Sequence, residues 1–153
     1  MGILKISKEI IFATCEQKLH EKINYLQKEM SDLMYGLEND TKSSAGDKHE
    51  TARAMMQIDY EKSLRQLTDA NTQMSLLKKI NHHTDANVIS AGSLIYTNHG
   101  AIFIAISLGK IKIEQHDVMV ISPQSPLALK FMQAKKSSSI SMNGIDYIIE
   151  KVE

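Results

Sequence analysis

Two long stretches of the chain carry apolar residues at the spacing of a helix seam. In the first stretch these residues recur at alternating steps of four and three, which is typical of one helix packed on another. They are Leu19, Ile23, Leu26, Met30, Leu33 and Leu37. In the second stretch a similar rhythm predicts a seam of Met56, Tyr60, Leu64, Leu67 and Met74, with Asn71 as a polar seam position. We therefore expect two helices of matching length.

A polar break separates the two stretches. Residues Asn39 to Asp47 read Asn-Asp-Thr-Lys-Ser-Ser-Ala-Gly-Asp, a composition typical of a loop. Two helices joined by a short loop run antiparallel. Residues 1–80 are thus predicted to form an antiparallel helical hairpin, a coiled coil with its tip near 39–47.

The pattern changes after residue 80. Residues 81–90 are polar and are predicted to be a linker, and 91–153 show the short apolar runs of a small, mostly antiparallel β domain. Turns are expected at 97–100 and at Asn143-Gly144. A short helix is expected to start at Pro126, to be capped by Ser125 and to cover one face of the sheet. The predicted fold class is α+β.

The composition is that of an ordinary soluble globular protein, with 42% hydrophobic and 24% charged residues. Lys and Arg together number 18, as do Asp and Glu, so the chain has no global basic field for nucleic acid. Contact with DNA or RNA is therefore expected to be local or to run through a protein partner.

Two further features bear on the cellular compartment. Cys15 is the single cysteine, which excludes an internal disulfide, and its apolar helical surroundings predict a small buried residue. The N-terminal residues lack the pattern of a secretory signal, and no apolar run approaches the roughly 20 residues needed to span a bilayer. We expect a cytoplasmic protein without membrane contact.

Several segments of the chain, taken together, resemble a known family. The predicted hairpin is followed by Gly92-Ser93-Leu94 opening the β domain, by Ile-Ser-Pro-Gln-Ser-Pro-Leu-Ala-Leu at 121–129, and by Tyr147-Ile148-Ile149. This arrangement resembles the Gre transcript-cleavage factors of bacterial RNA polymerase. The resemblance implies an FKBP-like fold for the C-terminal domain and docking of that domain at the rim of the polymerase secondary channel. The implied docking segment is 122–129, with Ser122, Pro123, Ser125, Pro126 and Leu127 as its binding residues.

The resemblance also implies a function for the hairpin tip. In the family the coiled coil enters the channel, where acidic tip residues help to hold a second Mg²⁺ and a water for cleavage of backtracked RNA. A hard divalent cation prefers oxygen ligands, which explains the need for carboxylates there. The protein would then not be an enzyme and would have no cofactor of its own, because it lends ligands to the polymerase active site and shares its Mg²⁺. The implied partners are RNA polymerase and, indirectly, nascent RNA, bound by a monomer.

The tip of this chain departs from the family pattern. When Ala52-Arg53 is placed on the family's Ala-Lys pair, Lys42 and Ala45 fall near the expected acidic positions. The nearest carboxylates, and our candidates for the tip, are Asp40, Asp47 and Glu50. Asp47 and Glu50 also fit a capping box at the start of the second helix, which is an alternative structural role.

The histidines offer weaker candidates. His82, His83 and Asp85 lie together in the predicted linker, but adjacent side chains point in different directions and lack the spacing of a metal site. We expect a solvated linker there. His49 lies at the tip, where it is expected to be an exposed residue of the first helical turn, and contact with RNA or a catalytic water is the alternative.

Three functions follow, from different classes. The first is a factor that binds polymerase through its secondary channel and stimulates transcript cleavage. The second is a relative that occupies the same channel without delivering metal and so inhibits or regulates elongation. The third is an FKBP-like isomerase or chaperone, which needs a pocket lined by aromatic side chains. A structural coiled-coil adaptor is a further alternative, because fold alone does not fix function.

Overall fold

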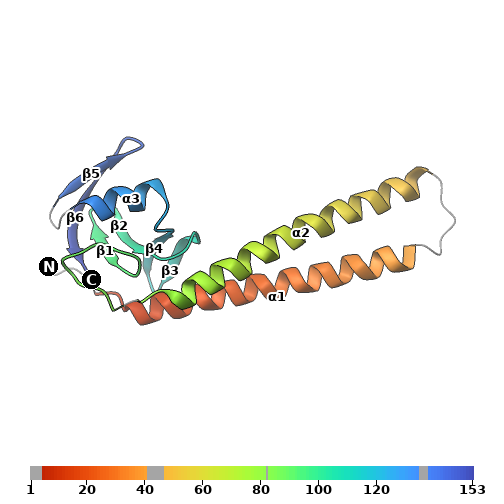
Figure 1. The fold of residues 1–153 in the computed structure, drawn as a ribbon, viewed down its shortest axis with the longest axis horizontal. Coiled ribbons are helices and arrows are strands. Elements are labelled where there is room, and N and C mark those ends of the chain that lie inside the picture. Colours follow the sequence, from red (N-terminus) through yellow and green to blue (C-terminus); the bar gives the residue numbers. More distant parts are fainter. Residues whose placement is uncertain (1–4, 41–46, 82, 135–137) are drawn as a thin grey trace. The chain divides into compact units, whose positions relative to one another are not determined.

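The computed structural model of the protein describes residues 5–40, 47–81, 83–134 and 138–153. Two long helices, α1 (Lys8–Asp40) and α2 (Asp47–Lys79), pack on one another and are followed by a sheet of six strands (Figure 1). The predicted α+β class is confirmed in these terms.

The chain forms two compact units. One unit consists of residues 17–74, which make up most of the two helices. The other joins the residues before 17 to residues 75–153, so the first turns of α1 and the last turn of α2 belong with the sheet.

The seam of α1 is confirmed. Every predicted position is buried or half-buried, and the four most enclosed are Leu19, Ile23, Leu26 and Leu37. The positions between them are mainly exposed and polar, so the helix buries a narrow stripe. Such a helix depends on its packing partner, because propensity alone leaves long polar helices only marginally stable in water.

The seam of α2 was predicted wrongly at two positions. Leu64 is 45% exposed and Asn71 is exposed, whereas Ser63 and Ala70, one residue earlier, are 4% and 1% exposed. Among the described side chains of α2, the buried and half-buried positions other than Gln73 follow one another at alternating steps of four and three. They are His49, Arg53, Met56, Tyr60, Ser63, Leu67, Ala70, Met74 and Leu77. Small side chains at a seam let two helices approach closely, so geometry outweighs hydrophobicity at these two positions.

The sheet has the strand order β3-β4-β2-β1-β6-β5. Its strands are β1 (Leu94–Thr97), β2 (Gly100–Ile104), β3 (Gly109–Ile113), β4 (His116–Ile121), β5 (Ser139–Met142) and β6 (Ile145–Val152). All neighbouring pairs are antiparallel except β2 and β4, which run parallel. The sheet is therefore mostly antiparallel, as predicted.

Both predicted turns are confirmed. Thr97 pairs with Gly100 across the β1–β2 turn. Asn143 and Gly144 connect β5 to β6 with φ angles of 52° and 79°. Positive φ at both central residues is the geometry that a two-residue hairpin requires, and Asn-Gly is the pair that adopts it most readily.

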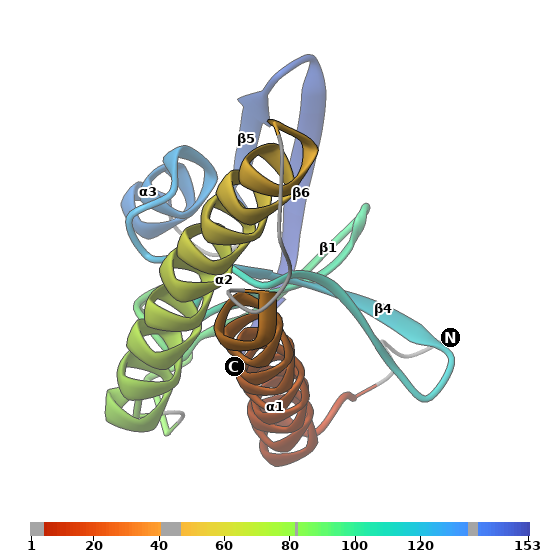
Figure 2. The ribbon, with the colours of Figure 1, turned by 90° about the vertical axis from the view of Figure 1, so that its right-hand side faces the viewer.

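Helix α3 (Pro126–Gln133) covers one face of the sheet (Figure 2). Ser125 caps it, because its hydroxyl accepts a hydrogen bond from the Ala128 N–H at 3.2 Å. Ala128 and Phe131 are fully buried against apolar residues of the sheet. These are Ile95, Ile102, Ile104, Ile149 and Val152. The predicted cap, start and covering role of this helix are confirmed.

Strand β6 pairs with two different strands along its length. Its first half pairs with β5 and its second half with β1, so β5 and the start of β6 extend past the other strands as a two-stranded ribbon (Figures 1 and 2). Asn98 closes the gap where the two pairings meet. Its side-chain oxygen accepts from the Ile148 N–H at 2.7 Å, and its side-chain nitrogen donates to the Asp146 carbonyl at 3.2 Å. The Asn98 side-chain amide thus makes two hydrogen bonds to β6 of the kind that a backbone peptide group makes between paired strands.

Tyr96 joins the opposite face of the sheet to the segment before α1. Its buried hydroxyl accepts a hydrogen bond from the Ile6 N–H at 2.8 Å and lies 3.4 Å from a Glu153 carboxylate oxygen. Burial raises the pKa of this phenol, because the charged form is poorly solvated there. Burial also lowers the pKa of Lys8, which donates to the Thr84 hydroxyl at 2.8 Å. The first residues of α1 are thereby fastened to the sheet.

Replacing Gly36 with Ala is expected to stabilise the helix pair by about 0.5–1 kcal/mol, because glycine inside a helix costs that much relative to alanine. Space allows the change, since an added Cβ would lie 3.5 Å from the Met56 sulfur. Thermal and urea unfolding measure the gain. Gly92→Ala is the matched control and should destabilise, because its Cβ would meet the Asn81 carbonyl oxygen at 2.1 Å and its φ is 96°. A loss of stability in Gly36→Ala would contradict the described packing.

Replacing Tyr96 with Phe is expected to cost about 1–3 kcal/mol near neutral pH, because the buried Ile6 N–H loses its acceptor. The difference in the free energy of unfolding between the unaltered protein and the Phe variant should become smaller as pH rises. The folded protein holds the phenol proton more tightly than the unfolded chain does, so this stability is complete below the ordinary pKa of 10.0 and is lost above it. Urea unfolding of both proteins at pH values below and above 10.0 measures this difference in free energy. A difference that stays constant or grows above the ordinary pKa would contradict the role of the Tyr96 hydroxyl as acceptor for the Ile6 N–H.

Candidate functional site

The break between the long helices holds the predicted tip carboxylates. Helix α1 ends at Asp40 and α2 begins at Asp47, so the break lies within the predicted 39–47. Residues 41–46, which include Lys42 and Ala45, and the side chains of Asp40 and Asp47 lie outside the described part of the chain. Glu50 is exposed in the first turn of α2, whereas His49, one residue before it, is half-buried and not exposed as predicted. The proposed tip roles of these residues stay predictions.

Arg53 fastens the two helices together close to this break. Its guanidinium donates to the carbonyl of Leu37 at 3.0 Å. That carbonyl belongs to the last turn of α1, where carbonyl groups lack a partner within the helix and carry partial negative charge. A cation placed there satisfies the group and stabilises the helix end. This contact was not predicted, because the chain reversal that brings Arg53 to Leu37 leaves no local signal in the sequence.

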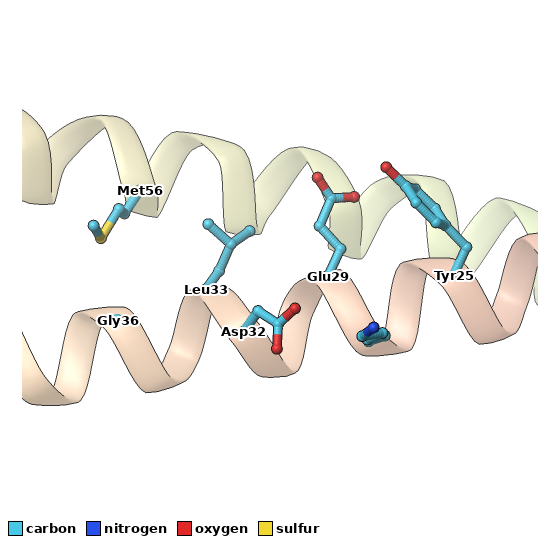
Figure 3. Close-up of a pocket in the computed structure, with 7 residues that line it drawn as sticks. Tyr25, Glu29, Asp32, Leu33, Gly36 and Met56 are labelled. Atoms are coloured by element: carbon cyan, nitrogen blue, oxygen red, sulfur yellow. The ribbon is translucent and has the colours of Figure 1, made fainter.

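A hollow about 410 Å³ in volume opens beside the seam (Figure 3). Its floor is apolar and consists of Leu33, Met56 and the bare backbone of Gly36. Lys28 and the residues Tyr25, Glu29 and Asp32 complete the lining. Figure 3 shows Tyr25 and Glu29 rising from α1 beside α2, with Met56 reaching down from α2 toward Gly36. We call this the Glu29 hollow.

A second hollow, of about 580 Å³, is lined by a different set of residues from the same helices. They are Met34, Leu37, Glu38, Arg53, Gln57, Tyr60 and Glu61. Here Arg53 lies beside the carboxylate-bearing residues Glu38 and Glu61, so cationic and anionic side chains share the lining. We call this the Arg53 hollow. The two hollows share no residue, and each is lined by one cationic and two anionic side chains.

The predicted docking segment is held largely by its own hydrogen bonds. The Ser122 hydroxyl accepts from the Gln124 N–H at 3.1 Å, and the Ser125 hydroxyl donates to the Ser122 carbonyl at 2.7 Å. Ser125 also caps α3. Both serines therefore shape the turn, and their hydroxyls serve the fold.

The remaining side chains of the segment differ in exposure. Leu127 packs against the core beneath α3 and Pro123 is half-buried. Pro126 is exposed, and so is Leu129, at 49%. Pro126 and Leu129 therefore give this segment its apolar surface. Leu129 lies within the predicted docking segment 122–129, but it was not among the individual binding residues predicted there.

The polar residues after α2 form local turns. The Asn81 side chain accepts from the His83 N–H at 3.0 Å, and the Asp85 carboxylate accepts from the Asn87 N–H at 2.8 Å. His82 lies outside the described residues. Across the residues that the structure describes, no three His, Cys, Asp or Glu side chains gather as metal ligands would. The turn contacts agree with the expectation of a polar linker.

Comparisons with known proteins leave the family open. Neither the protein-family models nor the curated proteins include a match to this chain. Within the described ranges, no helix has the length and apolar content that crossing a membrane requires.

Proposed function

We propose that this protein is a cytoplasmic factor of the Gre type that binds bacterial RNA polymerase through its secondary channel and stimulates cleavage of backtracked RNA. One observation carries the proposal: two long packed helices meet a polar, carboxylate-flanked break, and a small sheet unit follows them with a helix that starts at Ser125-Pro126. The proposal includes an antiparallel hairpin, an FKBP-like C-terminal domain and a monomeric state.

The dimensions of the helix pair support entry into a channel. Each helix has 33 residues, and at 1.5 Å per residue this gives a reach of roughly 50 Å. Two packed helices form a rod only about 20 Å across. The seam keeps such a rod together up to Leu37 and Arg53, close to the break. A rod of this kind can carry a chemical group deep into a narrow protein opening.

The proposed chemistry belongs to the polymerase. Asp40, Asp47 and Glu50 would supply oxygen ligands that help to hold a second Mg²⁺ beside the polymerase carboxylates. The metal would activate a water and stabilise charge on the phosphate during hydrolysis of the RNA backbone. The protein itself would bring the ligands and leave with them, without forming a bond to the RNA.

The runner-up is a non-cleaving regulator of the same polymerase. It is favoured by the tip sequence, since alignment on Ala52-Arg53 puts Lys42 and Ala45 where the family has acidic residues. The isomerase alternative has less support. A hollow of about 400 Å³ in the sheet unit is lined by charged side chains such as Lys110 and Asp117, and Tyr96 is the single Tyr in its lining. A prolyl-binding pocket calls for aromatic walls.

Removing the tip charges one at a time tests metal delivery. Asp40→Asn, Asp47→Asn and Glu50→Gln keep the shape of each side chain and remove its charge. We expect at least one of them to slow 3′ RNA cleavage in a stalled, backtracked complex by about 100-fold, the scale of losing one preorganised electrostatic group. Melting should be unchanged, because Asn caps a helix as well as Asp does.

Asp69→Asn is the matched control, because it removes the same charge from an exposed position of α2 away from the break. It should cleave at the normal rate. If the unaltered protein competes for the channel but produces no cleavage, the non-cleaving regulator is the correct function. If it does not bind polymerase at all, both proposals fail.

Replacing Leu129 with Asp tests docking through the 122–129 segment. We expect polymerase affinity to fall by about tenfold, since a central apolar contact is worth more than about 1 kcal/mol. The melting temperature should change little, because Leu129 is already 49% exposed. Met119→Asp is the control, since Met119 is 39% exposed on β4, outside this segment. Equal affinity of the Leu129 variant and the unaltered protein, measured by fluorescence anisotropy, would place docking elsewhere.

A further inference from the structure

The Glu29 hollow combines an apolar floor with two carboxylates that have no partner in the part of the chain that the structure describes. Among the described residues, neither the Glu29 nor the Asp32 carboxylate has a hydrogen bond or an ion pair. Lys28 lines the same hollow, yet it forms no ion pair with either of them. One cation and two anions leave the lining with a net negative charge.

The placement of the two carboxylates does not help the helix. Residues three apart lie on the same helix face, and like charges at this spacing destabilise the helix slightly. Glu29 is half-buried, so its charge is also less well solvated than that of a fully exposed carboxylate. Partner binding would give the pair a favourable role that folding does not.

The shape of the hollow restricts what can occupy it. Gly36 has no side chain and faces Met56, whose sulfur lies 3.5 Å from where a Cβ would stand. This leaves an apolar trough between the helices, with Leu33 on its floor (Figure 3). Tyr25 is 66% exposed and presents its ring at the same hollow as the two carboxylates. A long aliphatic stem with a cationic end matches these three features together.

We propose that the Glu29 hollow binds an arginine side chain presented by a protein partner. The aliphatic stem would lie over Leu33 and Met56, and the guanidinium would meet Glu29 and Asp32. Arginine is favoured over lysine because its planar group can pair with a carboxylate through two hydrogen bonds and stack on an aromatic ring such as Tyr25. The identity of that partner as RNA polymerase rests on the proposed function, whereas the chemistry of the hollow does not.

The first test uses a small probe with the full chain. Protein labelled with ¹³C at the methionine methyl groups is titrated with the blocked tripeptide Leu-Arg-Leu, and with the citrulline analogue that lacks the charge. The Met56 methyl signal should shift and saturate with the arginine peptide only. Met34 lines the Arg53 hollow and serves as an internal control that should not move. No shift at Met56, or equal shifts with the citrulline peptide, would overturn the proposal.

A matched pair of variants shows whether the carboxylates are responsible. The double change Glu29→Gln and Asp32→Asn should weaken peptide binding about fivefold or more, the effect of losing partly desolvated ion pairs. Glu61→Gln removes a charge from the Arg53 hollow and should leave binding unchanged. These substitutions keep the helix, so unaltered melting verifies that folding is not the cause. If the double change and Glu61→Gln weaken peptide binding equally, the overall charge of the protein explains the effect and the assignment of arginine to the Glu29 hollow is wrong.

The same variants, assayed for binding to RNA polymerase, separate this proposal from the proposed function. Weaker polymerase binding by the double variant, with Glu61→Gln unchanged, supports both. Arginine-peptide binding without any polymerase binding refutes the proposed function and leaves the hollow assigned to another partner. Polymerase binding that is equal in all variants overturns the assignment of the hollow to that partner.

Discussion

The seam between α1 and α2 is the interaction on which the helix pair depends. Along this seam α1 buries large apolar side chains such as Leu26, and α2 buries the small residues Ser63 and Ala70. Outside this stripe both helices are largely polar, so neither has another apolar face to bury. Tertiary packing therefore supplies most of the helical stability, and a single narrow contact can hold a rod of this length.

The character of the seam changes toward the break. Ala70 and Met74 are buried, whereas Met56 and Arg53, nearer the break, are only half-buried. Near the break, the hydrogen bond from Arg53 to the Leu37 carbonyl adds a polar contact between the two helices. Met56 lines the Glu29 hollow and Arg53 lines the Arg53 hollow, so both hollows open at this looser part of the seam.

The sequence predicted the features that have a local cause. The α1 seam is apolar at every position, Asn143-Gly144 adopts a turn by itself, and Ser125-Pro126 starts a helix by itself. Features that depend on tertiary contact were missed or misplaced. Ser63 and Ala70 carry no strong apolar signal, so Leu64 and Asn71 were chosen instead.

The candidate sites likewise depended on tertiary contacts that the sequence does not show. Ser122 and Ser125 looked available for docking, but their hydroxyls serve the turn and the cap. Glu29 and Asp32 were not among the predicted site residues, because the hollow that they line also requires Met56 of the other helix. The parallel pairing of β2 with β4 also lacks a local signal, since the paired strands are joined through β3.

The central claim is that the break between the helices reaches the polymerase active site, and a tethered cutting reagent tests it directly. Cys15 is buried and is the only cysteine, so Cys15→Ala with Ala45→Cys provides one attachment point in the 41–46 segment. An iron chelate attached there and activated in a backtracked complex should cut the polymerase chain beside its catalytic carboxylates and the RNA near its 3′ end. Stable binding with cuts confined to the outer polymerase surface would contradict the account.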